Sequence, residues 1–171
     1  DGGILNFAKY QETHPNASYT PRYEDTGYFL LKYLPRQGGN SQCTGDKDLN
    51  YRNNLRVYRY AETLLNAAEL ILRTGGDTAE AQNYLDQVRA RAYRTTIENL
   101  GAHKVVANID NVLEERHLEL YGEGKRFWDL VRSGKANEVL GSRGYKDNKK
   151  YLPIPSSEID KSAGTLTQNP Y

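Results

Sequence analysis

Four glutamate carboxylates lie close together in the segment 113–134, which reads LEERHLELYGEGKRFWDLVRSG. A pair of carboxylates that flanks a cleft can perform general acid–base catalysis. In this segment, however, charges of opposite sign recur mostly three or four positions apart, which makes their side chains neighbours on a helix. This alternation favours structural ion pairs over catalysis. It involves Glu115, Arg116, Glu119, Glu123, Arg126, Asp129 and Arg132.

Two glycines interrupt the segment and predict a bend. Gly122 and Gly124 stand on either side of Glu123. Because glycine ends helices readily, we expect one helix to end near Tyr121 and the next to begin near Lys125. The two helices would then meet at an elbow.

The ion pairs around this elbow have two interpretations. Ordinary surface pairs would each contribute about 0–1 kcal/mol. We favour a partly buried network that fixes the bend by placing Arg116 and Glu119 against Arg126 and Asp129. The aromatic pair that follows Arg126 is expected to shield the network from water, with Trp128 packed in the core.

Other catalytic or metal-binding patterns are absent from the sequence. It contains no G-x-S-x-G, H-E-x-x-H, P-loop or dinucleotide-binding motif. The lone Cys43 allows neither an internal disulfide nor a C-x-x-C metal site. Asp46 and Asp48 have a D-x-D spacing that could hold Ca²⁺, although an Asx-rich turn is the simpler interpretation. We therefore predict that the protein is not an enzyme and uses no cofactor or metal.

The composition narrows the class of partner. The 23 basic and 22 acidic residues give a net charge of +1, which provides no electrostatic footprint for nucleic acid. The 14 tyrosines among 171 residues favour a wet surface for polar ligands, because tyrosine combines a flat apolar ring with a hydroxyl.

No apolar run is long enough for a transmembrane helix or a signal peptide. The start Asp-Gly-Gly, without Met, is typical of a processed or excised fragment.

The chain divides by pattern into three regions. Residues 1–56 form an irregular, loop-rich segment with one short expected strand within 28–34. Residues 57–140 carry the helical patterns. Residues 141–171 form a loop and an extended tail, in which Pro153 and Pro155 are expected to rule out a helix. We take all three regions as parts of one mainly α domain.

The helical region predicts an antiparallel pair and three further helices. Apolar residues at helical spacing mark 57–73 and 77–92, with Gly75 and Gly76 between them and Asp77 as N-cap of a capping box with Glu80. The pair spans 34 residues from Arg59, the length of a tetratricopeptide unit. The other helices are expected at about 108–121, 124–132 and 135–140.

Four segments carry a resemblance to a known family. The segment 113–134 resembles the E-R-x-x-E-L-x-x-E-G-x-R-x-x-D-L-x-R-x-G signature of the SusD/RagB family, with His117 and Ser133 departing from it. Three other segments resemble family patterns in the same order: TGYFLLKY at 26–33, RYAETLLNAAE at 59–69 and the tail 151–171. The resemblance covers about 26–171. Because family chains are much longer, it implies a C-terminal portion.

This resemblance implies a function and a location. Members of the family are lipoproteins of Bacteroidetes outer membranes that bind glycans or other nutrients at the cell surface without hydrolysis. They deliver these ligands to a SusC-like TonB-dependent transporter. For this chain it implies tetratricopeptide-like helix pairs with long irregular loops, packed against an N-terminal part of the same protein. The lipid anchor would lie on an N-terminal Cys outside the chain.

Ligand contacts are expected in the loops, since sites often lie on loops. The candidates supply aromatic platforms and polar groups for sugar hydroxyls, and the alternative for each is an ordinary loop residue. They are Tyr19, Tyr23, Arg36, Gln37 and Tyr51. A second function also fits the helix pairs, a tetratricopeptide-type adaptor that binds a peptide in a helical groove. It leaves the tyrosine-rich loops and the proline-rich tail unexplained.

Overall fold

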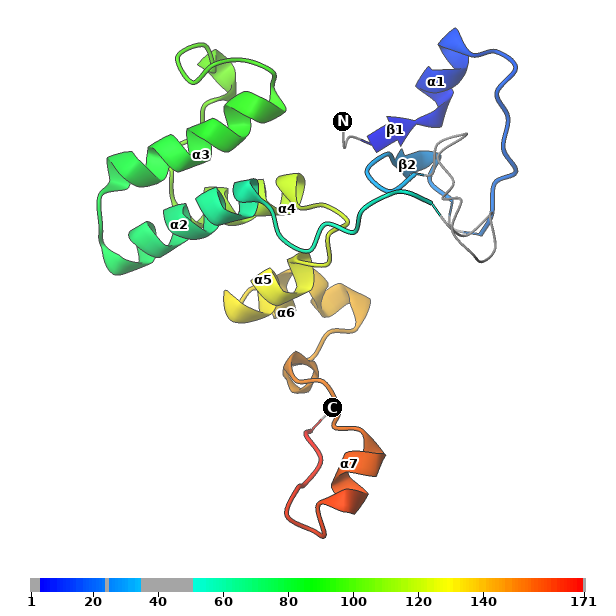
Figure 1. Ribbon diagram of the computed structural model, residues 1–171, viewed down its shortest axis with the longest axis vertical. Helices are drawn as coiled ribbons and strands as arrows, with labels where there is room; N and C mark the ends of the chain where they lie inside the picture. Colours follow the sequence, from blue (N-terminus) through cyan, green and yellow to red (C-terminus); the bar gives the residue numbers. More distant parts are fainter. Residues whose placement is uncertain (1–3, 24, 35–50, 171) are drawn as a thin grey trace. The chain divides into compact units, whose positions relative to one another are not determined.

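The computed structural model describes residues 4–23, 25–34 and 51–170 (Figure 1). The chain separates into two units, residues 1–57 and residues 58–171. No helix in these described ranges is long and apolar enough to cross a membrane. The arrangement is helix-rich with few strands, as the sequence predicts.

The first unit contains a two-stranded sheet, and a short helix lies between its two strands in the sequence. Strand β1 (Ile4–Asn6) pairs antiparallel with β2 (Tyr28–Leu30), so that Ile4 faces Leu30 and Asn6 faces Tyr28. Helix α1 (Phe7–Thr13) follows β1 directly, and the Asn6 side chain caps it by accepting from the amide of Lys9. The predicted irregularity of this region is therefore wrong over β1 and α1, whose short elements carry too little periodicity to be recognised.

The expected strand within 28–34 is shorter than predicted. It spans Tyr28–Leu30, the three residues that pair with Ile4–Asn6 of β1. The next residues turn instead, with the amide of Tyr33 donating to the Leu30 carbonyl at 3.3 Å.

The second unit begins with the predicted antiparallel helix pair. Helices α2 (Tyr60–Thr74) and α3 (Thr78–Ala92) lie side by side in Figure 1, joined by a three-residue loop. Gly75 ends α2 in the left-handed conformation at φ 70°, and Asp77 caps α3 by accepting from the Ala79 amide at 2.8 Å. Both caps confirm local sequence signals.

Two details of this pair correct the sequence analysis. Helix α2 begins at Tyr60 rather than Val57, and these two residues are 70% and 71% exposed instead of facing the core. The capping-box contact expected of Glu80 is replaced by another bond, since the Tyr84 hydroxyl donates to its carboxylate at 2.6 Å.

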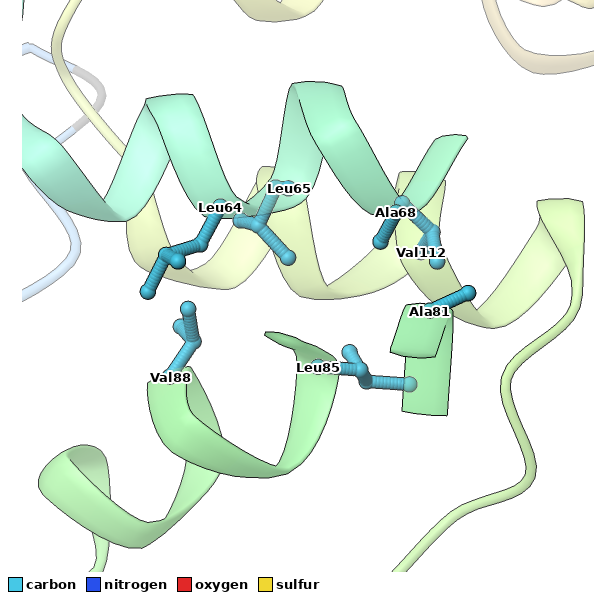
Figure 2. Packing of buried hydrophobic residues seen from close by; sticks show 7 residues of the cluster. All are labelled: Leu64, Leu65, Ala68, Ala81, Leu85, Val88 and Val112. Atoms are coloured by element: carbon cyan, nitrogen blue, oxygen red, sulfur yellow. The ribbon is translucent and has the colours of Figure 1, made fainter. Parts of the chain in front are cut away.

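A compact apolar core joins α2, α3 and α4 (Ile109–Glu119). Figure 2 shows its side chains meeting between the three helices. Helix α4 begins where the Asn108 side chain accepts from the Asn111 amide at 2.8 Å, close to the predicted start of this helix. The core residues are Leu64, Leu65, Ala68, Ala81, Leu85, Val88 and Val112.

The remaining helices are short. They are α5 (Arg126–Arg132), α6 (Ala136–Leu140), the 3₁₀ helices Gly101–His103, Gly141–Arg143 and Asp147–Lys150, and α7 (Ser156–Lys161). Helix α7 corrects the prediction of a wholly extended tail. It starts immediately after Pro155, because proline disrupts a helix interior but is tolerated at the start, where its missing N–H has no partner.

The tail is extended on both sides of α7 and is held together by side-chain amides. Gln168 both accepts from the Ile154 amide and donates to the Ile154 carbonyl, each at 2.8 Å. The Asn169 side chain donates to the Leu152 carbonyl at 2.8 Å.

Candidate functional site

The elbow between α4 and α5 forms as predicted. Helix α4 ends at Glu119, and α5 begins at Arg126. Gly122 and Gly124 both adopt left-handed backbone, at φ 75° and 73°. Residues with a Cβ rarely adopt this conformation, so the two glycines are what permits the sharp turn.

Arg116 is the centre of the charged network at this elbow. Its side chain is 4% exposed, and its Nε donates to Asp129 at 2.9 Å, which confirms the predicted pair. Its guanidinium also donates to Asn66 and lies 3.7 Å from Glu62, both on α2. The network is therefore buried and reaches a helix that the sequence analysis did not include.

Glu119 pairs with other cations than the predicted Arg126, and this part of the prediction is wrong. Its carboxylate accepts from Arg59 and Arg91, which precede α2 and lie in α3. Arg59 also donates to Glu123 at 3.0 Å. These cations come from residues far away in sequence, so helical spacing could not reveal them.

Arg132 links α5 to α2. It donates to Asp129 and to Glu69, each at 2.7 Å. Burial alone would raise the pKa of Glu69, but the hydrogen bonds and charges of Arg132 and Arg73 outweigh it and hold that pKa below its ordinary value. The same bonds raise the pKa of Arg132, so this pair stays charged.

Glu115 has the opposite balance. Burial, ahead of the opposing attraction of Arg89, raises the pKa of its carboxyl. The carboxylates named around the elbow thus have guanidinium partners, and the arrangement is suited to holding helices rather than to moving protons.

Arg126 and Asp129 do border a cavity of about 350 Å³ between α4, α5 and α6. Asp129 is committed to Arg116 and Arg132 there. Arg126 makes a 3.9 Å ion pair with the exposed Glu114.

Trp128 is 49% exposed and packs edge-on against Phe127, so the predicted burial of this tryptophan is wrong for the described chain.

A different kind of site lies in the first unit. A cavity of about 470 Å³, here called the Tyr19 pocket, opens between β1, α1, β2 and the loop that precedes β2. Its volume lies in the range of small-molecule sites. The lining residues are Asn6, Phe7, Ala8, Gln11, Ser18, Tyr19, Thr26, Gly27 and Tyr28.

Aromatic contacts position Tyr19 at this pocket. Its ring centroid lies 4.4 Å from that of Phe7 and 5.1 Å from that of Phe29, both in edge-on geometry. Such edge-on pairs are favourable because the positive ring edge meets the negative ring face. The three rings come from α1, the following loop and β2, so the cluster depends on the pairing of β1 with β2.

Short hydrogen bonds hold the loops around the pocket. The Gln11 side chain donates to the Ala17 carbonyl at 2.9 Å. The Asp25 carboxylate accepts from the Gly27 amide at 2.8 Å, where Gly27 has φ 72°. Partial desolvation, followed by the charge and hydrogen bond of Asp25, raises the pKa of the Tyr19 phenol. Tyr19 therefore stays a neutral hydroxyl in neutral solution.

The five predicted ligand residues fall in different places. Tyr19 lines the pocket, whereas Tyr23 and Tyr51 are not among its lining residues and are 92% and 37% exposed. Arg36 and Gln37 lie outside the described residues. That these five residues contact a ligand stays a prediction.

Several pocket residues were not predicted from the sequence as ligand contacts. Tyr28 lines the pocket. From the sequence it was assigned only to the family pattern at residues 26–33 and was not predicted to contact a ligand. Asn6 and Gln11 gave no signal, because β1 and α1 were not predicted. Asp46, Asp48 and Cys43 lie outside the described residues, and within the described ranges no cluster of metal-ligating side chains is present.

Comparison with known proteins identifies the family. The sequence model of the SusD family matches residues 8–171, and the chain therefore belongs to this family. SusD-like protein P2 of Formosa agariphila is 32% identical over 181 residues, covering 99% of this chain and 34% of that protein. SusD-like protein P38 of the same organism is 42% identical over 95 residues, covering 52% of this chain and 18% of that protein.

Solved structures resemble the whole chain. Surface glycan-binding protein A from Bacteroides thetaiotaomicron is 46% identical with a TM-score of 0.80, and the match covers 98% of this chain and 37% of that one. That protein has also been solved in complex with laminarihexaose, where the TM-score is 0.79. A laminarin-binding SusD-like protein is 43% identical with a TM-score of 0.78, covering 98% of this chain and 33% of that one. The chain thus spans about a third of the length of these relatives.

Proposed function

We propose that this chain is part of a cell-surface protein that binds glycans without cleaving them. Its family membership and its likeness to glycan-binding structures support the proposal. The observation that carries it is the Tyr19 pocket, where aromatic rings lie beside neutral amide and hydroxyl groups. Aromatic rings suit the apolar faces of sugar rings, and amides and hydroxyls suit their hydroxyl groups.

The absence of hydrolysis is part of this proposal. A glycosidase needs two carboxyl groups that flank the scissile bond, one of them able to donate a proton. The buried carboxylates at the elbow are instead held by arginines, as in Asp129 with Arg116 and Glu69 with Arg132. No carboxylate is present among the described residues that line the Tyr19 pocket.

The proposal extends to partners and location. The bound glycan would be delivered to a SusC-like TonB-dependent transporter in the outer membrane. The chain would contact an N-terminal part of the same protein, which would carry the lipid anchor. The regions 1–56, 57–140 and 141–171 would all belong to one C-terminal domain.

The adaptor alternative is less well supported by the helix packing. A peptide-binding adaptor needs an open groove along its helices. The surface between α2 and α3 is covered by α4, whose Val112 is fully buried in the shared core (Figure 2). A peptide would have to displace that helix.

Calorimetric titration with laminarihexaose tests the proposal directly. We expect saturable binding, and no shorter oligosaccharides when the incubated mixture is separated by chromatography. Tyr28→Ala should weaken binding about 5- to 30-fold, because it removes an apolar contact of about 1–2 kcal/mol. Tyr151→Ala is the matched control, since Tyr151 is 54% exposed against 57% for Tyr28 but lies in the tail. Products of hydrolysis, or no binding of any glycan, would contradict the proposed function.

A further inference from the structure

We propose that the Tyr19 pocket selects electrically neutral glycans and rejects glycans that carry carboxylate or sulfate groups. This inference rests on the proposed glycan-binding function and adds the charge class of the ligand. It depends on the charge of the side chains that line the pocket and on the hydrogen bonds that the neighbouring polar groups already make.

The described residues that line the pocket carry no charged side chain. Its polar groups are the amides of Asn6 and Gln11 and hydroxyl groups, although charged residues make up 26% of the chain. The cavity between α4, α5 and α6 shows the contrast within the same protein. That cavity is bordered by Asp110, Glu114, Arg126, Asp129, Lys135 and Glu138.

Binding of an anionic group in a protein generally uses arginine, lysine or free amides at a helix start. Among the described residues of the pocket lining there is no such cation. The start of α1 adjoins the pocket, but two of its amides are already used. The Phe7 amide donates to the Gly27 carbonyl at 2.9 Å, and the Lys9 amide donates to the Asn6 side chain at 3.3 Å.

A negative charge lies in contact with the described lining. The Asp25 carboxylate accepts from the amide of Gly27, which lines the pocket, and its charge contributes to the raised pKa of Tyr19, which also lines it. A carboxylate or sulfate on the ligand would approach this charge without a compensating cation. A neutral sugar meets no such repulsion and can use the Tyr19, Asn6 and Gln11 groups as hydrogen-bond partners.

The test compares ligands of equal length and different charge on the protein that carries this chain. Calorimetry at low ionic strength would use laminarihexaose as the neutral probe and a hexasaccharide of uronic acids as the anionic probe. We expect the anionic probe to bind at least tenfold more weakly. Tyr28→Ala should weaken binding of the neutral probe, which ties that binding to the pocket.

A gain-of-binding variant sharpens the test. Ser18 lines the pocket and is exposed, so Ser18→Lys adds a cation there without disturbing a buried group. We expect it to strengthen binding of the anionic probe about tenfold, with the gain lost in high salt. Ser157→Lys places the same charge on exposed α7 and should have no such effect.

The possible outcomes distinguish a failure of charge selection from a failure of the proposed glycan-binding function. If the anionic probe binds as tightly as the neutral one and Tyr28→Ala weakens both, charge selection is wrong while glycan binding stands. If the neutral probe binds and Tyr28→Ala leaves it unchanged, the pocket is not the site and the inference fails. If neither probe nor any other glycan binds, the proposed function itself fails.

Discussion

The two units of this chain are stabilised in different ways. Residues 58–171 bury a cluster of apolar side chains together with charged ones such as Arg116 and Asp129, each 4% exposed. Among the described residues of 1–57, by contrast, none is buried. That unit relies on a three-residue strand pair, half-buried aromatic rings and local hydrogen bonds.

This difference separates the helical scaffold from the proposed ligand surface. Buried ion pairs with several hydrogen bonds fix helices in one arrangement and tolerate little change. Half-exposed aromatic and amide groups keep contact with water and can exchange it for a ligand. The comparison therefore places rigidity at the elbow and adaptability at the Tyr19 pocket.

The largest effect is expected from breaking the network at Arg116. Arg116→Met removes the buried cation that lies between Asp129 and Glu62. Each of these buried carboxylates then keeps one cationic partner nearer the surface, Arg132 for Asp129 and Lys125 for Glu62. We expect the free energy of unfolding to fall by about 3–5 kcal/mol, measured by urea denaturation. Lys161→Met is the matched control, because its pair with Glu158 is exposed and contributes about 0–1 kcal/mol. Equal effects of the two variants would show that the elbow is no scaffold.

A pH series on Glu69 sharpens the same point. Because the folded-state pKa of Glu69 is lowered, its carboxylate stabilises the fold above the ordinary glutamate pKa, and this contribution is lost as the pH falls below it. The stability difference between the wild type and Glu69→Gln should therefore shrink as the pH is lowered from 7 towards 3. Thermal unfolding at each pH measures it.

Glu115→Gln serves as the counterpart of opposite sign. Burial raises the pKa of Glu115, so this group contributes stability at low pH that is lost as the pH rises. The difference between the wild type and this variant should grow as the pH falls. The same trend in both variants would contradict the assigned pKa directions.

A smaller and more local effect is expected in the first unit. Phe7→Ala removes the edge-on partner of Tyr19, 4.4 Å away, from a cluster that is only half buried. We expect a local loss of about 1–2 kcal/mol, less than for a buried core phenylalanine. Hydrogen exchange should quicken at amides of residues 4–34 while those of α2 and α3 stay protected. Faster exchange throughout α2 would show that the two units are not stabilised separately.

Features that depend on interactions between nearby residues could be predicted from the sequence, whereas features that depend on distant residues could not. Gly75, Asp77 and Asn108 act on backbone groups within a few residues, so the C-terminal end of α2 and the starts of α3 and α4 were predictable. The proline rule failed at Pro155 because the rule applies to helix interiors and α7 begins beyond it. Trp128 was misplaced because helical neighbours alone do not show what covers a side chain.

By itself, the sequence determined helices α2 to α6, the caps between α2 and α3 and the glycine elbow, together with the family signature, since each of these depends on nearby residues. Only the tertiary structure decided which charges meet and where a pocket opens. Glu119 takes its cation from Arg59, 60 residues away, rather than from its own segment. The Tyr19 pocket likewise exists because β1 pairs with β2 across the intervening loop and brings Asn6 opposite Tyr28. Contacts between distant residues depend on how the whole chain packs, and no local spacing encodes them.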